Sequence, residues 1–250
     1  MLDAPFSVTG KRILIAGGTR GIGRAISLQF ARSGAAVIAN YVRDDAAAGS
    51  LVEEAGGTGL TTCRADITTA EGKRHLIETL GDAPLSALVF AAATGIHRPL
   101  HELTLRHWDF TFALNARALF DLVQTLRSKL TAGSTIVAIS SEGAVHAFPN
   151  YGLVGASKGA LEALCRHLSL ELAAAGIRVN VLSPGTVLTQ ALDAFPDKEE
   201  RIREAVGRSP RGRLTTLEEV ALAAQFLCCD ASAGLNGHTL VVDGGERIAR

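Results

Sequence analysis

Short apolar runs alternate with longer amphipathic segments along the whole chain. Seven of these runs are rich in β-branched residues and short enough to be strands, at residues 12–17, 35–41, 58–63, 86–93, 134–141, 177–185 and 238–245. Near-continuous apolar strands that alternate with helical segments are typical of a parallel sheet covered by helices on both faces. We therefore predict an α/β fold with a single Rossmann-type, doubly wound parallel sheet of about seven strands.

Two of the helical segments, at residues 103–130 and 150–175, are long and apolar on more than one face. A helix that is apolar nearly all round is expected to be buried on both sides. One side would pack on the sheet and the other on a symmetry mate, across a two-fold interface. We predict a homotetramer or homodimer.

The chain has 250 residues, and no linker-like stretch or change of composition divides it, so we expect one domain over residues 1–250. Its 25 basic and 25 acidic residues cancel to a formal net charge of zero. Such a chain gives no reason to expect nucleic acid or an anionic membrane as a partner. No apolar run approaches the about 20 residues of a membrane span, and no signal-peptide pattern opens the chain. We expect a cytoplasmic protein.

The cysteines and two of the histidines were considered as metal ligands. The four cysteines lack the CxxC or Cys/His spacing of a metal site, so we expect free thiols buried in the core, at Cys63, Cys165, Cys228 and Cys229. His97 and His101 have the spacing of helical metal ligands, but Pro99 between them argues against that helix. We predict no metal.

A glycine-rich turn follows the first predicted strand directly. Gly17, Gly21 and Gly23 lie where this strand is followed by an amphipathic helix. Because glycines carry no Cβ atom, such a turn lets backbone N–H groups and the helix N-terminus approach a pyrophosphate. The strand before and the helix after favour nucleotide binding over a merely structural turn.

The spacing of this turn, G-x-x-x-G-x-G, is not the commoner G-x-G-x-x-G of dinucleotide-binding folds. Together with motifs spread over nearly the whole chain it resembles the short-chain dehydrogenase/reductase family. These motifs are Asp66 with Ile67, Asn115, Ser141, Lys158, SPGTVLT at residues 183–189 and VVDGG at residues 241–245. The resemblance implies a catalytic set made of Ser141, Tyr151, Lys158 and Asn115. It also implies that the cofactor is bound by Gly17, Thr19, Arg20, Gly21, Ile22, Gly23, Tyr41, Arg43, Asp66, Ile67, Ala92, Tyr151, Lys158, Pro184, Gly185, Val187 and Thr189.

The end of the second strand bears on the choice of cofactor. Enzymes that prefer NAD place a carboxylate there for the ribose hydroxyls, whereas a 2′-phosphate is repelled by a carboxylate and attracted by arginine. Here the strand ends in Asn40 and Tyr41, Arg43 follows, and Arg20 stands in the glycine turn. We predict NADPH, and we interpret the nearby Asp44 and Asp45 as the capped start of the next helix.

The position of the tyrosine is unusual for the family. Most members carry the catalytic tyrosine four residues before the lysine, where this chain has Val154, and Ser141 takes the place of the family serine. Tyr151 stands one helical turn earlier. Seven residues fall only about 20° short of two turns, so Tyr151 and Lys158 share a face of the predicted helix.

A tyrosine seven residues before the lysine resembles the enoyl-acyl-carrier-protein reductases of this family, and the flanking sequence resembles their NADPH-dependent third type. In a ketoreductase the donor stands beside the carbon that accepts hydride. In an enoyl thioester the charge develops on an oxygen two carbons further along, so the donor must move back with it. The resemblance implies NADPH-dependent reduction of the carbon–carbon double bond of an enoyl thioester, bound to acyl carrier protein or CoA, in fatty acid or polyketide biosynthesis. It further implies that Lys158 holds the nicotinamide ribose and that Asn115 retains water next to that lysine.

Two alternatives stay open. One is a ketone or aldehyde reductase of secondary metabolism, with Tyr151 or Ser141 in the role of the acid. The other is an NADPH-binding regulatory protein without turnover.

The chain also departs from the family in its first and fourth predicted strands. The family motif Asn-Asn-Ala-Gly is replaced by residues 90–93, Phe-Ala-Ala-Ala, and the threonine before the glycine turn is Ala16. We expect the two losses to be linked, because removing both partners of a buried polar contact costs little. Residues 188–213 are expected to be a helical insertion that acts as a substrate lid.

Overall fold

The computed structural model describes residues 5–195 and 197–249 and contains one seven-stranded parallel sheet. The strands are β1 (Arg12–Ala16), β2 (Ala36–Tyr41), β3 (Leu60–Arg64), β4 (Leu85–Phe90), β5 (Leu130–Ile139), β6 (Arg178–Pro184) and β7 (Thr239–Val242). They lie side by side in the order β3-β2-β1-β4-β5-β6-β7, and every neighbouring pair is parallel. The predicted fold class is confirmed.

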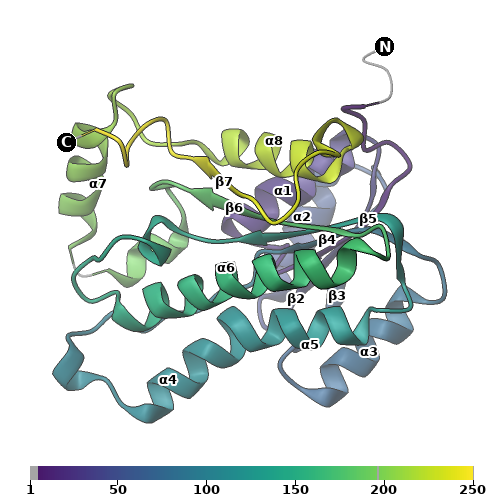
Figure 1. Ribbon diagram of the computed structural model, residues 1–250, viewed down its shortest axis with the longest axis horizontal. Helices are drawn as coiled ribbons and strands as arrows, with labels where there is room; N and C mark the ends of the chain where they lie inside the picture. Colours follow the sequence, from purple (N-terminus) through teal and green to yellow (C-terminus); the bar gives the residue numbers. More distant parts are fainter. Residues whose placement is uncertain (1–4, 196, 250) are drawn as a thin grey trace.

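Helices cover both faces of this sheet (Figure 1). One face carries α1 (Gly21–Arg32), α2 (Asp45–Ala55) and α8 (Leu217–Cys228). The other face carries α3 (Ala70–Leu80), α5 (Ala118–Thr125) and α6 (Gly152–Ala173). The remaining helical segments are η1 (Leu100–Glu102), α4 (Leu105–Phe112), the π-helical η2 (Ala113–Arg117), η3 (Glu142–Ala144), η4 (Gln190–Ala194), α7 (Lys198–Arg208) and η5 (Asp230–Ser232). In Figure 1, α7 lies at the same end of the molecule as the C-terminus.

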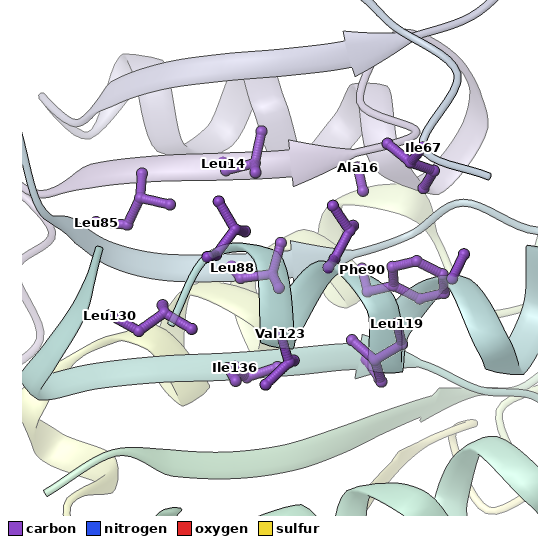
Figure 2. Packing of buried hydrophobic residues seen from close by; sticks show 14 of the residues in the cluster. Leu14, Ala16, Ile67, Leu85, Leu88, Phe90, Leu119, Val123, Leu130 and Ile136 are labelled. Atoms are coloured by element: carbon purple, nitrogen blue, oxygen red, sulfur yellow. The ribbon is translucent and has the colours of Figure 1, made fainter. Parts of the chain in front are cut away.

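The inner strands are largely buried on both faces, which is why their sequences are almost continuously apolar. The edge strands β3 and β7 are partly exposed. Alternate residues of one strand enter opposite cores: Leu14 packs with α3, α5 and α6, whereas Ile13 packs with α1 and α8. Figure 2 shows part of the first core, where Leu88 and Phe90 of β4 lie among side chains of β1, β5 and α5. All four cysteines are buried free thiols, as predicted.

The order of the strands reverses beside β1, because β2 and β4 flank it on opposite sides. In open parallel sheets, ligands bind outside the carboxyl ends of the strands at such a switch point. The glycine turn, the loop after β4, Ser141 after β5 and the SPGTVLT segment after β6 all lie at this edge.

The structure corrects the bounds of both long helices. The segment predicted as one helix over residues 103–130 is divided into α4, η2 and α5, and it ends at Thr125. The π-helical turn is centred on Asn115, whose side chain is held by the backbone of another loop. Leu130 instead pairs with Leu85 in the sheet. The second helix begins at Gly152 and not at residue 150, because Asn150 has a φ of +59°, outside the right-handed helical region.

Between residues 188 and 213, the predicted insertion contains η4 and α7. Among the described residues, no helix has both the length and the apolar character needed to span a membrane.

Candidate active site

The glycine turn between β1 and α1 has the shape that a pyrophosphate site needs. Gly17 has a φ of +77°, and a Cβ atom there would lie 2.7 Å from Cα of Ala92. A Cβ atom on Gly23 would overlap the carbonyl oxygen of Gly17, so both positions require glycine. No side chain caps the N-terminus of α1, which leaves its first backbone N–H groups available to an anion. The turn therefore fits the diphosphate of a dinucleotide.

The junction after β2 combines both charges near the predicted adenosine site. Asp44 caps α2 by accepting a hydrogen bond of 2.9 Å from the N–H of Ala47, as expected for the capped start of that helix. A guanidinium nitrogen of Arg20 lies 3.8 Å from the Asp44 carboxylate, and both side chains are well exposed. Arg43 is exposed as well. Arg43 is next to Asp44 in the sequence, so two arginines and one carboxylate lie near the end of β2, where a 2′-phosphate is predicted to bind.

Other predicted adenosine contacts are engaged in local hydrogen bonds. The Tyr41 hydroxyl donates to the Asp45 carboxylate over 2.8 Å. Asp66 accepts hydrogen bonds from the backbone N–H and the hydroxyl of Thr68, while Ile67 next to it is buried. These contacts hold the turn after β3 in place at the carboxyl edge of the sheet.

Ser141 and Tyr151 form the polar centre of the site. The Tyr151 hydroxyl donates a hydrogen bond of 3.1 Å to Oγ of Ser141. Ser141 lies two residues after the end of β5, and Tyr151 is the residue that precedes the first turn of α6. The Tyr151 ring lies so close to Gly143 that a Cβ atom there would overlap it. Burial raises the pKa of the Tyr151 hydroxyl above its ordinary value, and the Ser141 bond and the Arg201 charge oppose the rise.

Val154 occupies the place of the usual family tyrosine and is buried. Its Cγ2 methyl lies against Gly95 in the loop after β4, so closely that a Cβ atom on Gly95 would overlap it. Valine therefore closes this position with an apolar side chain, and Gly95 is needed for the close approach.

Lys158 lies deep in α6 and is almost fully buried. Its Nζ donates a hydrogen bond of 2.7 Å to the carbonyl oxygen of Ile139. Burial lowers the pKa of Lys158 to about 8. The nearby Cys165 and Glu162 act in the opposite direction and raise this pKa. Arg201 of α7 supplies a positive charge near Tyr151. Tyr151 is the residue before α6 and its backbone is not helical, so a shared helix face with Lys158 stays a prediction. The Tyr151 hydroxyl is bonded to Ser141.

Asn115 fastens η2 to the loop after β4. Its Oδ1 accepts a hydrogen bond of 2.8 Å from the Thr94 N–H, and its Nδ2 donates to the Thr94 carbonyl over 2.8 Å. The same Nδ2 donates to Oγ of Ser157 on α6, one residue before Lys158. Asn115 therefore connects three segments around the lysine, and its predicted role toward water stays a prediction.

The two departures in β1 and β4 meet in the core. Ala16 and Phe90 are register partners in neighbouring strands, and both are fully buried. Figure 2 shows Phe90 beside Leu119 of α5. The family's polar residues are thus replaced on both sides by apolar side chains that pack. The second asparagine of the family motif corresponds to Ala91, whose N–H donates a hydrogen bond of 2.9 Å to the Ala16 carbonyl. The linkage of the two losses stays a prediction.

A group of rings surrounds Tyr151 from segments far apart in the sequence. The centroid of His97, in the loop after β4, lies 5.5 Å from that of Tyr151 and 3.9 Å from that of Phe195. The rings of Tyr151 and Phe195 are 6.0 Å apart. Arg201 of α7 stacks on Phe195 at 4.4 Å and donates a hydrogen bond of 2.9 Å to the carbonyl of Pro149. The insertion therefore covers the tyrosine directly.

Sequence reasoning missed Phe195 and Arg201, because nothing in their spacing distinguishes them from surface residues of the insertion. It also missed Glu246, which follows the VVDGG motif and is almost fully buried. Its carboxylate accepts hydrogen bonds from the backbone N–H of Thr186 and from Arg208 of α7. The signal available in the sequence was an acidic residue directly after the VVDGG motif.

The SPGTVLT segment leads from the sheet to the insertion. The Gly185 N–H donates to the carbonyl of Val242, and Pro184 ends β6. Val187 is buried and bridges to Thr215, while Thr189 contacts the place where Gly21 would carry a Cβ atom. The segment thus runs from β6 to the glycine turn, along the edge where the cofactor is expected.

Comparison with known proteins supports the motifs. A family model described as enoyl-(acyl carrier protein) reductase matches residues 16–246. A 1-cyclohexenylcarbonyl-CoA reductase of Streptomyces collinus is 35% identical, and the alignment covers 94% of this chain and 86% of that protein. A tropinone reductase homologue of Arabidopsis thaliana is 34% identical over 97% of this chain and 92% of that protein.

Solved structures agree over the whole fold. A dehydrogenase/reductase of Sinorhizobium meliloti superposes with a TM-score of 0.87 at 31% identity, covering 97% of both chains. A Beutenbergia cavernae protein assigned as an NAD(P)-dependent gluconate 5-dehydrogenase was solved with NADP bound at low occupancy. It superposes with a TM-score of 0.86 at 32% identity, covering 98% of this chain and all of that one. With its parallel sheet, its glycine turn and its Ser141–Tyr151 pair, the chain belongs to the short-chain dehydrogenase/reductase family of oxidoreductases.

Proposed function

We propose that the protein reduces the carbon–carbon double bond of an enoyl thioester with NADPH. The observation that carries the proposal is the hydrogen bond between Tyr151 and Ser141, formed although valine fills the usual place of the tyrosine. The donor pair of the family is retained, but its tyrosine enters from the residue before α6. This displacement suits an acceptor whose developing charge lies further from the carbon that is reduced.

The proposed chemistry uses the hydroxyls of Tyr151 and Ser141. The glycine turn would hold NADPH, which when bound would supply the hydride for the β-carbon. Tyr151 donates a hydrogen bond to the thioester oxygen as the double bond shifts and negative charge develops there. Ser141 orients the tyrosine hydroxyl, and water protonates the α-carbon of the resulting enolate. Donors that are fixed before the reaction stabilise such charge without reorganisation.

The insertion supports this chemistry by excluding water. Phe195 packs beside Tyr151, and Arg201 attaches α7 to the carbonyl of Pro149, two residues before Tyr151. Closing an active site strengthens the electrostatic interactions inside it. We propose that η4 and α7 form the substrate lid.

The preference for NADPH is proposed from the charges at the adenosine end. Arg20 and Arg43 are both exposed there, and the side chain of Arg20 is free to turn from Asp44 toward a 2′-phosphate. The Beutenbergia cavernae structure with bound NADP supports the choice. Asp44 is the group that would favour NADH instead.

Reduction of a ketone is the second candidate, because several relatives are named as tropinone reductase homologues. The Ser141–Tyr151 pair could equally protonate a carbonyl beside the hydride. Membership of an oxidoreductase family leaves the regulatory, non-catalytic alternative without support. We further propose a place in fatty acid or polyketide biosynthesis, which would follow from an enoyl thioester substrate. We also propose a cytoplasmic location, which the free thiols of all four cysteines support.

The two candidates are separated by one comparison of substrates. The purified protein is mixed with NADPH and either a crotonyl or an acetoacetyl thioester, each as the CoA and the carrier-protein form, and NADPH oxidation is followed. We expect faster turnover with crotonyl thioester and formation of the saturated acyl product. Oxidation of NADPH with acetoacetyl thioester alone would overturn the proposal in favour of a ketone reductase.

A further inference from the structure

His97 is the polar group of this pocket to which neither the family motifs nor the proposed chemistry assigns a role. It lies seven residues after β4 ends, in a loop at the edge of the sheet where the site is built. Its ring is nearly parallel to that of Tyr151, with the centroids 5.5 Å apart, and it contacts Phe195 of the insertion. His97 therefore borders the same space as the catalytic hydroxyl.

The contacts of the two ring nitrogens decide where the imidazole carries its proton. Nδ1 is buried and has no hydrogen-bond partner among the residues that the structure describes. A proton on Nδ1 would therefore be a buried donor without an acceptor, which costs about 1–3 kcal/mol. The neutral ring avoids this cost by carrying the proton on Nε2.

Nε2 faces the position that the family tyrosine has vacated. It lies 3.3 Å from the point where a Cβ atom on Gly95 would sit, and the Cγ2 methyl of Val154 overlaps the same point. His97 Nε2 and Val154 thus adjoin across Gly95. In this protein an imidazole N–H stands beside the place where other family members have a phenol.

The surroundings keep this imidazole neutral. Burial and the charge of Arg201 lower the pKa of His97, and Asp197, which is itself bonded to Arg201, opposes this only in part. A neutral imidazole donates one hydrogen bond and does not transfer its proton near neutral pH.

We propose that the Nε2–H of His97 is a second hydrogen-bond donor to the substrate oxygen that Tyr151 contacts, so that the two side chains form the oxyanion site. The proposal rests on the proposed function, in which that oxygen belongs to an acyl thioester. Two donors from different segments fix the direction of the carbonyl as well as stabilising its charge. His97 then fills the electrostatic role that Val154 cannot take.

The test compares His97→Phe, which keeps a ring but loses the nitrogen atoms, with His97→Gln, which returns an N–H donor. His101→Phe is the matched control, since His101 lies in the same loop segment with an exposed side chain. We expect His97→Phe to lower kcat/KM for crotonyl thioester about 10- to 100-fold, and His97→Gln to recover at least about tenfold of that loss. KM for NADPH should stay within about twofold, and His101→Phe should match the unchanged protein.

A binding measurement separates this proposal from the proposed function. The Kd of butyryl thioester for the NADP⁺-bound protein is measured by calorimetry for the same variants. We expect His97→Phe to weaken binding and His97→Gln to restore it. If the unchanged protein reduces no enoyl thioester, the proposed function fails, and this Kd series still decides the role of His97. Equal kcat/KM and Kd in His97→Phe and the unchanged protein, or no recovery in His97→Gln, would overturn the proposal.

Discussion

At the scale of single residues, the proposed chemistry depends most directly on the hydroxyl of Tyr151. It is buried, and its pKa is raised, so it is protonated and able to donate at neutral pH. Its acceptor is Ser141, at a distance that a substrate oxygen could share. The ring itself is held by Gly143, His97 and Phe195, so removing the hydroxyl leaves its packing in place.

Tyr151→Phe should therefore lower turnover of an enoyl thioester by about 10²–10³ and leave the affinity for NADPH nearly unchanged, because one transition-state donor is lost. Steady-state kinetics and cofactor titration measure both quantities. Val154→Tyr in the Tyr151→Phe background provides the companion test. It returns a hydroxyl to the usual family position, and any activity gained should appear with ketones. Full enoyl reductase activity in Tyr151→Phe would show that the hydroxyl is not the donor.

Lys158 links the site to the stability of the fold. The folded protein holds its pKa near 8, below the ordinary 10.5, so the unfolded chain binds the proton more readily. This lysine should make the free energy of unfolding increase as the pH rises from about 8 to 10.5. Below pH 8, burying its charge lowers the free energy of unfolding by the full amount, about 3 kcal/mol.

Lys158→Met removes that cost. We expect it to raise the free energy of unfolding at pH 7, measured by urea denaturation. Most of this advantage should be lost at pH 10.5, where the lysine is neutral in the folded protein and half protonated in the unfolded chain. The lost bond to the Ile139 carbonyl reduces the gain. Turnover and cofactor binding should both suffer. An equal stability difference at the two pH values would mean that charge burial is not its cause.

At the scale of elements, the junctions after β1 and β2 lie together and carry the groups that we propose select the cofactor. The Gly18 N–H donates to the Asn40 carbonyl, which ties the glycine turn to the end of β2. Arg20 directly precedes α1, and Asp44 directly precedes α2, so both charges stand at helix N-termini. Small changes there are expected to alter cofactor choice without disturbing the sheet.

Changing Arg20 and Arg43 together to Ala should raise KM for NADPH well over tenfold and KM for NADH far less, because arginine–phosphate contacts contribute about 1.5–3 kcal/mol each. Asp44→Asn is the matched variant: asparagine still caps α2, but the carboxylate that would repel a 2′-phosphate is gone. It should lower KM for NADPH relative to NADH. Equal losses for both cofactors in the double variant would place the arginines in folding and not in recognition.

At the scale of the whole molecule, large apolar side chains remain exposed on the helices that were predicted to pair. On α4, Leu105 is 82% exposed and Trp108 45%, and Leu170 on α6 is 77% exposed. Trp108 stacks on Phe112 with the ring centroids 4.2 Å apart, which makes a rigid apolar surface. Exposed apolar patches of this kind commonly mark interfaces between chains.

We therefore expect the protein to sediment as a dimer or tetramer at micromolar concentration. Trp108→Glu should shift it toward the monomer, because a carboxylate cannot be buried unpaired in an apolar interface. Val52→Glu, at an exposed apolar position on α2 of the opposite layer, is the control and should leave the assembly unchanged. A clean monomer of the unchanged protein would contradict the prediction.

Local patterns in the sequence determined the sheet, the glycine turn and the placement of Ser141. Strand burial leaves a continuous apolar run, and a turn that brings backbone against backbone tolerates only glycine, as Gly17 and Gly23 illustrate. The replacements at Ala16 and Phe90 could also be recognised in the sequence, because both residues lie in predicted strands.

Only the tertiary structure decided what surrounds Tyr151. Phe195 and Arg201 reach it from a distant insertion, and the proton position on His97 depends on which ring nitrogen the fold buries. The π-helical turn at Asn115 likewise depends on a backbone bond to Thr94, 21 residues earlier. Such contacts arise from packing between distant segments, whose sequence periodicity records which face is buried but not which side chain lies opposite.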